Sequence, residues 1–236
     1  MDETGTDWTR QVGDYCERLN AAHPAGFWAE PLNAVTNAAF LIAAFVAYRE
    51  AARRDRFDGP VVFLLINLCA IGVGSFLFHT FSTIWAALMD TTPIMIFILA
   101  YFTITMNRYV GLAWGWAALS ILGFLAAMVA MSYVLNVLLR DIVGGSVSYG
   151  PALLSLLAIG GWLASRGHPA GRGLMIAAGL FTLSLTFRAL DDPVCSALPT
   201  GTHFLWHCLN ATVLGWLIVT LVRHGTAPTA LRAAPA

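Results

Sequence analysis

Long apolar stretches separated by short polar ones dominate the chain. No Asp, Glu, Lys or Arg occurs in residues 59–89, 109–139, 142–165 and 193–222. Each stretch is longer than the roughly 20 residues that a membrane-spanning helix needs. Gly, Pro and charge clusters divide the apolar sequence into seven expected helices. They are predicted near residues 32–48, 60–80, 84–106, 111–136, 148–165, 173–190 and 203–222. The pattern therefore predicts an all-α polytopic membrane protein, a seven-transmembrane-helix bundle.

The two ends of the chain are more polar than the expected helices. The first residues, MDETGTDWTRQVGDYCERLN, are acidic and lack the basic start and apolar core of a signal peptide. We therefore expect an N-terminal segment over 1–31, a membrane domain over 32–222 and a tail over 223–236.

The thirteen basic residues are unevenly divided between the two ends of the expected bundle. The end that includes the C-terminus carries Arg49, Arg53, Arg54, Arg56, Arg108, Arg166, Arg172, Arg223 and Arg232. The other end carries Arg10, Arg18, Arg140 and Arg188. Because cytoplasmic loops hold the excess of basic residues, we expect the N-terminus outside and the C-terminus in the cytoplasm.

The charge content supports a membrane location and limits the possible partners. Charged residues make up 11% of the chain, against about 25% in a typical soluble domain. The formal net charge is zero, so nothing indicates a polyanionic partner such as nucleic acid. No feature indicates an obligate protein partner either, and we expect the partners to be membrane lipids.

Four ionisable residues are predicted to meet at one end of the bundle. Such groups cost at least about 2.5–3.5 kcal/mol each at membrane depth, so they indicate function. His79 ends the second expected helix, Asp90 lies early in the third, and His203 begins the seventh. His207 follows His203 by one helical turn, so the two imidazoles share a face. By the expected topology all four lie on the outer side.

These residues suggest a catalytic zinc site. Three imidazoles leave zinc one open position, as in catalytic sites, whereas structural sites are usually closed by four ligands. Zinc lowers the pKa of bound water to about 7. Asp90 can then accept a proton and return it to a leaving amine. Ser75 precedes His79 by one turn, on the same helical face, where its hydroxyl can stabilise an oxyanion. The pattern predicts hydrolysis of an amide or ester at the membrane surface.

The histidines and Ser75 also have simpler interpretations. An HxxxH spacing often arises by chance, and this one lacks the Glu of soluble metalloproteases. His79 also suits an interfacial position, and Ser75 in GVGSF suits a close helix contact. The remaining ionisable candidates receive no role from the sequence: Arg188, Asp191, Asp192, His23, His168 and His224.

The order of these motifs resembles the alkaline ceramidase family. S-x-x-x-H, an Asp eleven residues later and a late H-x-x-x-H occur together with DYCE, FWAEPLNAVTN and DDPVC. The resemblance extends from about Asp14 to Asn210. That family belongs to a wider superfamily of seven-helix membrane hydrolases that includes the adiponectin receptors. Carried over to this chain, the zinc ligands and their catalytic partners are His79, His203, His207, Asp90 and Ser75.

The same family holds a calcium ion with oxygens from a D-W-x-E-x-N segment and a later Glu. Hard oxygen donors in an acidic loop suit calcium. Here Tyr15 replaces the Trp, Leu19 occupies the position of the Asn, and Asn20 follows it. An acidic helix N-terminus with Glu30 as its cap is the alternative interpretation. The ligands that the resemblance implies are Asp14, the Tyr15 backbone, Glu17, Asn20 and Glu30.

A disulfide between Cys16 and Cys195 follows from the expected topology. Both lie outside, in the N-terminal segment and in the loop before the last helix, where an oxidising compartment allows the bond. Members of the family also share this pair. Cys69 and Cys208 lie within expected helices, where free cysteines pack as small apolar residues. Two unpaired thiols remain the alternative for Cys16 and Cys195.

The sequence as a whole predicts an intramembrane zinc-dependent amidohydrolase. By resemblance it cleaves the N-acyl amide of ceramide or a ceramide-like lipid to a fatty acid and a sphingoid base. Zinc is expected as the catalytic cofactor, calcium as a second, structural ion, and the active site on the extracytoplasmic side. The alternative is a non-catalytic lipid receptor or sensor with a structural zinc. A bis-histidine haem protein needs histidines on opposed faces, and the pair at 203 and 207 shares one face.

Overall fold

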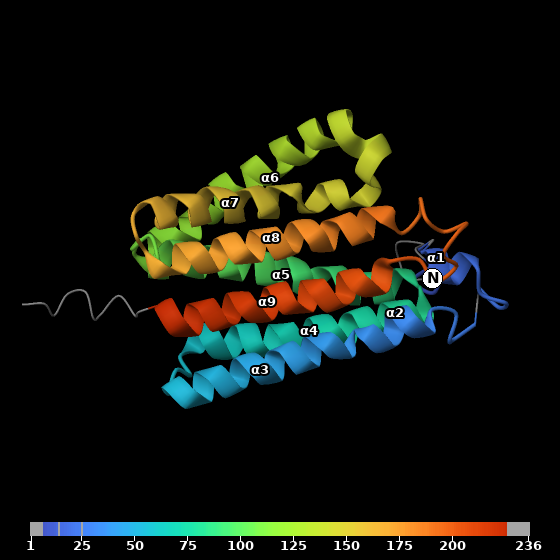
Figure 1. Ribbon diagram of the computed structural model, residues 1–236, viewed down its shortest axis with the longest axis horizontal. Coiled ribbons are helices and arrows are strands. Elements are labelled where there is room, and N and C mark those ends of the chain that lie inside the picture. The colour runs from blue at the N-terminus through green and yellow to red at the C-terminus, as the bar shows by residue number, and fades with distance from the viewer. Residues whose placement is uncertain (1–6, 14, 25, 226–236) are drawn as a thin grey trace, which may run out of the picture.

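Helices account for the regular secondary structure of the described chain, and no strand is present among the described residues (Figure 1). The computed structural model describes residues 7–13, 15–24 and 26–225, and only the backbone of 139–144. Residues 226–236 of the expected tail lie outside this part of the chain. Seven helices are long and apolar enough to cross a membrane. The predicted all-α fold with seven spans is therefore confirmed, whereas the orientation of the termini stays a prediction.

In chain order the helices are α1 (Cys16–Leu19), α2 (Pro31–Thr36), α3 (Ala38–Arg54), α4 (Gly59–Phe81), α5 (Ile84–Arg108), α6 (Trp114–Val143), the 3₁₀ helix η1 (Gly144–Tyr149), α7 (Gly150–Ser165), α8 (Pro169–Leu190) and α9 (His203–His224). Helices α2 and α3 together make the first span, Pro31–Arg54. The short α1 in the N-terminal segment was not predicted.

Several helix boundaries differ from the sequence prediction, and three of the differences have a local cause. Helix α3 continues through its arginines to Arg54, because charged residues end the apolar core of a span without ending its helix. Helix α6 begins at Trp114, since Gly111 takes φ +87° and interrupts the helix there. Helix α8 begins at Pro169, because a proline is favoured in the first helical turn, where its missing N–H has no partner to lose.

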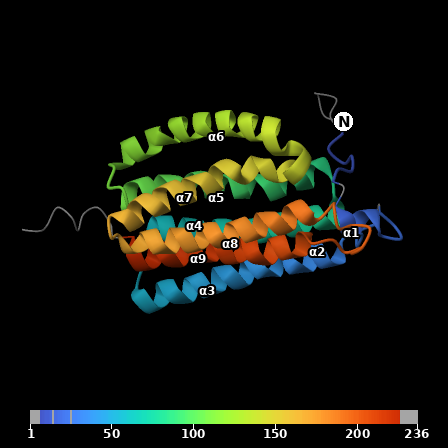
Figure 2. The same cartoon turned by 45° about the horizontal axis from the view of Figure 1, so that its top comes forward.

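Helix α9 lies at the centre of the bundle and α6 lies at its edge. Helix α9 is the most buried of the seven spans and packs against α3, α4 and α8. Helix α6 is on the side opposite α3 in both views (Figure 1, Figure 2) and contacts α5 and α7. Large apolar side chains such as Val129 and Tyr133 are exposed on its outer face, at 72% and 73%. Surfaces of this kind match a lipid environment and not water.

A close contact between α4 and α5 sets the position of two predicted catalytic residues. A Cβ at Gly74 would lie 2.0 Å from the carbonyl oxygen of Met89, so the helices can approach this closely only at a glycine. In a regular helix the Met89 carbonyl would accept a hydrogen bond from the N–H of residue 93, one turn further along α5. Pro93 occupies that position and has no N–H. The contact brings Ser75 of α4 beside Asp90 of α5.

The N-terminal segment covers the end of the bundle that holds His79, His203 and His207, called here the histidine end. The N–H of Val12 donates to the carbonyl of Ser82 at 2.7 Å, and the N–H of Ile84 donates to the carbonyl of Arg10 at 3.1 Å. These bonds hold the segment against the α4–α5 connection.

A disulfide joins Cys16 of α1 to Cys195 in the α8–α9 loop, with Cα atoms 5.4 Å apart. This separation lies within the usual range for the bond. The predicted pairing is confirmed, and it links two segments that are 179 residues apart in sequence.

Removal of this disulfide is expected to destabilise the histidine end. The double variant Cys16→Ser/Cys195→Ser should lose about 2–5 kcal/mol of unfolding free energy, because the denatured chain regains the freedom that the cross-link removed. Thermal unfolding in detergent measures the change. Cys69→Ala, which alters a free cysteine on α4, is the control. Equal melting temperatures for the double variant and the wild type would contradict a structural role for the bond.

Candidate metal centre and active site

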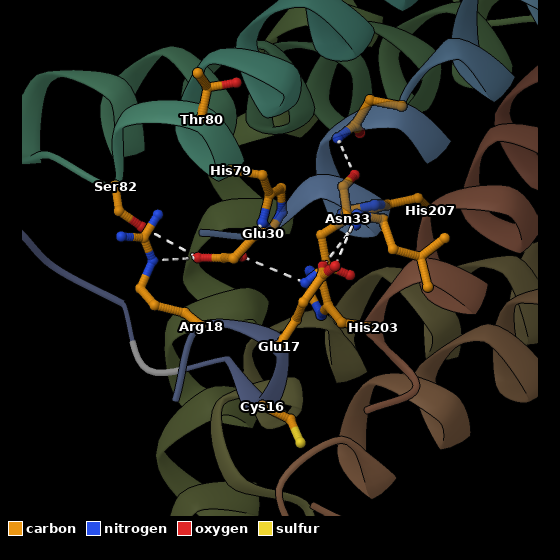
Figure 3. Close-up of polar contacts among 12 residues, drawn as sticks. Cys16, Glu17, Arg18, Glu30, Asn33, His79, Thr80, Ser82, His203 and His207 are labelled. Carbon is orange, nitrogen blue, oxygen red and sulfur yellow. Dashed lines mark hydrogen bonds and ion pairs between the residues drawn. The ribbon is translucent and has the colours of Figure 1, made fainter. Parts of the chain in front are cut away.

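Three buried histidines meet at the histidine end of the bundle (Figure 3). His79 comes from the last turns of α4, and His203 and His207 come from the first turns of α9. One ring nitrogen of each lies within 4.8 Å of the others, and no ring is more than 2% exposed. Within the described part of the chain, no other group of three or more His, Cys, Asp or Glu is placed to hold a metal ion.

Asp191 fixes the place where α9 begins. Its Oδ1 accepts hydrogen bonds from the backbone N–H groups of Thr202 at 2.8 Å and His203 at 2.9 Å. The first N–H groups of a helix have no partner within the helix, so this buried carboxylate caps α9. Its Oδ2 accepts from the N–H of Cys16 at 3.1 Å. Asp191 therefore positions His203 and fastens α1 to the same point.

A glycine makes this cap possible. Gly201 has φ +61°, and a Cβ there would lie 2.0 Å from Oδ1 of Asp191. Any other residue would be strained and would displace the carboxylate. The sequence had marked Asp191 as a candidate without a role. An acidic residue in the loop before a helix was the signal, but the residues to which it bonds became clear only in the fold.

Hydrogen bonds from outside the cluster orient two of the three rings. Nδ1 of His79 lies 2.5 Å from Oε2 of Glu30. Nδ1 of His207 lies 3.1 Å from the hydroxyl of Thr36, whose own hydrogen points toward the carbonyl of Leu32 at 2.8 Å. Each Nδ1–H is therefore the donor, and each Nε2 lone pair is left to bind a metal. Such partners fix the tautomer and orientation of metal-binding histidines.

Glu30 is fully buried between a cation and a histidine (Figure 3). Its Oε1 accepts from Nε of Arg18 at 2.5 Å, and Oε2 faces His79. Burial alone would raise the pKa of the Glu30 carboxyl, but His79 and Arg18 together hold this pKa below its usual value. Glu30 is therefore an ionised acceptor for the Nδ1–H of His79. Sequence reasoning had assigned Glu30 to calcium and missed this contact.

The cluster fits a metal that prefers nitrogen ligands. Nδ1 of His203 and Nε2 of His207 are buried and have no hydrogen-bond partner among the described residues. A buried polar atom without a partner costs roughly 1–3 kcal/mol, which a bound ion would offset. Three imidazoles that close only part of a tetrahedron are the ligand set of a catalytic zinc site.

His203 and His207 line a cavity, called here the polar cavity, together with Asp90 and Ser75. Asp90 does not belong to the group within metal-binding distance, so it faces the cavity without being placed as a ligand. The Ser75 hydroxyl lies beside the Asp90 carboxyl and can donate a hydrogen bond to it. The structure thus brings together all five residues of the predicted zinc site. Their chemical roles stay predictions.

The residues expected to bind calcium make other contacts. Both oxygens of Glu17 accept backbone N–H groups, from Leu32 at 2.7 Å and Asn33 at 2.8 Å, and so cap α2. Burial, the largest effect, raises the pKa of the Glu17 carboxyl. The side-chain amide of Asn20 donates to the carbonyl of Cys16 at 2.9 Å.

Arg18 places a positive charge in this segment, since it donates to Glu30 and to the carbonyl of Pro24. Glu30 itself bonds to His79. Asp14, the first expected ligand, lies outside the described residues. The carboxylates of Glu17 and Glu30 make other contacts, and the calcium site stays a prediction.

The fold and the site together define a seven-helix membrane protein with a buried three-histidine centre able to hold a metal ion. The family model described as Ceramidase matches residues 11–227, which is most of the chain. The chain belongs to the Ceramidase family, as the motifs had suggested. Membership implies an amide hydrolase that acts on a lipid. A comparison with curated proteins found no match.

The carboxylate behind His79 gives a test of the metal centre. Glu30→Gln is expected to lower zinc affinity by about 10- to 100-fold, because an amide is a weaker acceptor for the Nδ1–H and leaves the ring less basic. Competition with a metal-binding dye measures the affinity. Glu50→Gln changes a carboxylate that also holds two partners, Arg54 and Arg223, at the other end of the bundle, and is the control. Equal zinc affinity in the Glu30 variant and the control would contradict this role of Glu30.

Proposed function

We propose that the protein is a zinc-dependent amidohydrolase that cleaves the N-acyl amide of ceramide or a ceramide-like lipid within the membrane. The products are a fatty acid and a sphingoid base. The observation that carries the proposal is the cluster of three buried histidines, two of which share a cavity with Asp90 and Ser75, in a chain of the Ceramidase family.

His79, His203 and His207 would hold the zinc ion. When bound, zinc supplies a Lewis acid that polarises a carbonyl and lowers the pKa of water to about 7. Glu30 and Thr36 keep the rings of His79 and His207 in the orientation and tautomer that binding requires. The Asp191 cap holds the first turn of α9, and with it His203.

Asp90 is proposed to move the proton. Amide hydrolysis needs a base that takes a proton from water and an acid that gives one to the departing nitrogen. The Asp90 carboxyl faces the same cavity as His203 and His207 and can serve as both in turn. Ser75 is proposed to donate a hydrogen bond to the oxyanion that forms at the carbonyl carbon. Its place on the cavity that His203 and His207 also line supports this role.

A second, apolar cavity supports a lipid substrate. It adjoins the polar cavity, because Ile94, Tyr149 and Asn210 line both. Its other walls include Phe97 and Leu217, further along α5 and α9 from Asp90 and His207. A chain that enters here places its amide beside the histidines. We propose that the fatty acyl chain occupies this apolar cavity.

The purified protein with ceramide as substrate tests the proposal. Mass spectrometry should detect fatty acid and sphingoid base, a chelator should stop their formation, and added zinc should restore it. Stoichiometric zinc without any lipid hydrolysis would refute the enzyme and favour the receptor or sensor with structural zinc.

Two further measurements test the other expectations. Calcium analysis of the same sample tests the second metal ion. Protease access to the N-terminal segment in intact cells tests the proposed extracytoplasmic active site.

A further inference from the structure

Arg188 is a cation on the wall of the polar cavity. The proposed reaction gives this residue no role. It lies near the end of α8 and lines this cavity together with Asp90 and the histidines of α9. Among the described residues no carboxylate forms an ion pair with it. A positive charge in such a site needs a partner, and a ligand can supply one.

One hydrogen bond and two aromatic rings position the guanidinium. Its Nη1 donates to the hydroxyl of Ser146 at 3.0 Å. Its central carbon lies 5.4 Å from the ring centre of Tyr149 and 5.8 Å from that of Trp206, which are cation–π distances. These contacts fix the position of the charge without neutralising it.

The charges around the polar cavity favour an anionic ligand. Asp90 and Arg188 are the charged side chains among the described residues that line it, one of each sign and not joined as an ion pair. The proposed zinc ion would add two positive charges. With a neutral lipid bound, the cavity would keep this excess of positive charge. A lipid with an acidic group near its amide would reduce the excess positive charge.

The position of Arg188 along the bundle indicates which half of the substrate lies near it. The Thr202 hydroxyl bonds to the carbonyl of Phe187, so Arg188 lies level with the start of α9. The apolar cavity extends from the polar cavity in the opposite direction, toward Leu217. With the acyl chain in the apolar cavity and the amide at the histidines, the amine half of the lipid points toward Arg188.

We propose that Arg188 binds an anionic group on the amine half of the substrate, so that acidic N-acyl lipids are preferred to neutral ones. The inference rests on the proposed amide hydrolysis. The chemical class is a lipid amide whose amine half carries a phosphate, a sulfonate or a carboxylate. Guanidinium groups suit all three, because their planar N–H donors match the oxygens of such anions.

A matched pair of substrates tests the inference. Ceramide and ceramide 1-phosphate with the same acyl chain differ only by a phosphate on the amine half, and N-palmitoylserine supplies a carboxylate there. For the wild type, kcat/KM should be about 10-fold or more higher for the acidic lipids than for ceramide. In Arg188→Gln this ratio should fall by about 10- to 100-fold, since a charge-assisted hydrogen bond is lost. Arg188→Lys, which keeps the charge, should retain part of the preference.

The control is Arg166→Gln, an exposed arginine at the other end of the bundle, which should leave the ratio unchanged. If the wild-type protein hydrolyses ceramide but prefers neither acidic lipid, the inference about Arg188 is wrong. The proposed function would still hold. An equal loss on all substrates in Arg188→Gln also overturns it, because Arg188 would then serve the amide or the fatty acid product. Hydrolysis of none of the three lipids by folded, zinc-loaded protein means instead that the proposed function has failed.

Discussion

Replacement of His203 by alanine is expected to remove most of the zinc and to lower ceramide hydrolysis by on the order of 10³-fold or more. Two imidazoles cannot hold zinc as three do, and the reaction loses the polarisation that the ion supplies. Elemental analysis of the purified protein should give about one zinc per chain for the wild type and little for the variant.

His224→Ala is the matched control, since His224 ends the same helix at the opposite end of the bundle. It should keep both the zinc and the activity. If the triple variant His79→Ala/His203→Ala/His207→Ala still binds one zinc per chain, the metal lies elsewhere and the proposed centre is wrong.

The Asp90→Asn variant is expected to keep its zinc and to lose about 10²- to 10⁴-fold in kcat. Asparagine has nearly the same shape as aspartate but cannot accept and return a proton. Because Asp90 is not placed as a metal ligand, the zinc content should stay at the wild-type value. Measuring metal and turnover on the same sample separates the two effects.

Asp192→Asn removes an exposed carboxylate at the same end of the bundle and should leave turnover unchanged. An Asp90→Asn variant that turns over ceramide at the wild-type rate would leave Asp90 without a role in proton transfer. A variant that loses zinc along with activity would make Asp90 part of the metal centre.

The seven spans and the histidine cluster could be predicted because both follow from order along the chain. Uncharged runs longer than a bilayer fix where the helices lie, and alternating spans fix which helix ends share a side. His79 at the end of one helix and His203 at the start of another must then lie at the same end of the bundle. The spacing from His203 to His207 puts their rings on one face.

The contacts that support the histidines could not be predicted, because they join distant segments. Glu30 lies 49 residues from His79, and no local pattern pairs them. Glu17 illustrates the same limit: its carboxylate caps α2 from 15 residues away, and from sequence it resembled a calcium ligand. The side on which the histidine end lies follows from the arginine counts and stays a prediction.

The most direct test of the account is a zinc titration of chelator-treated protein during ceramide hydrolysis. The rate should rise in proportion to bound zinc, reach its maximum at about one ion per chain and stay constant beyond it. Protein stripped of zinc that still hydrolyses ceramide at the full rate would contradict a catalytic metal held by His79, His203 and His207.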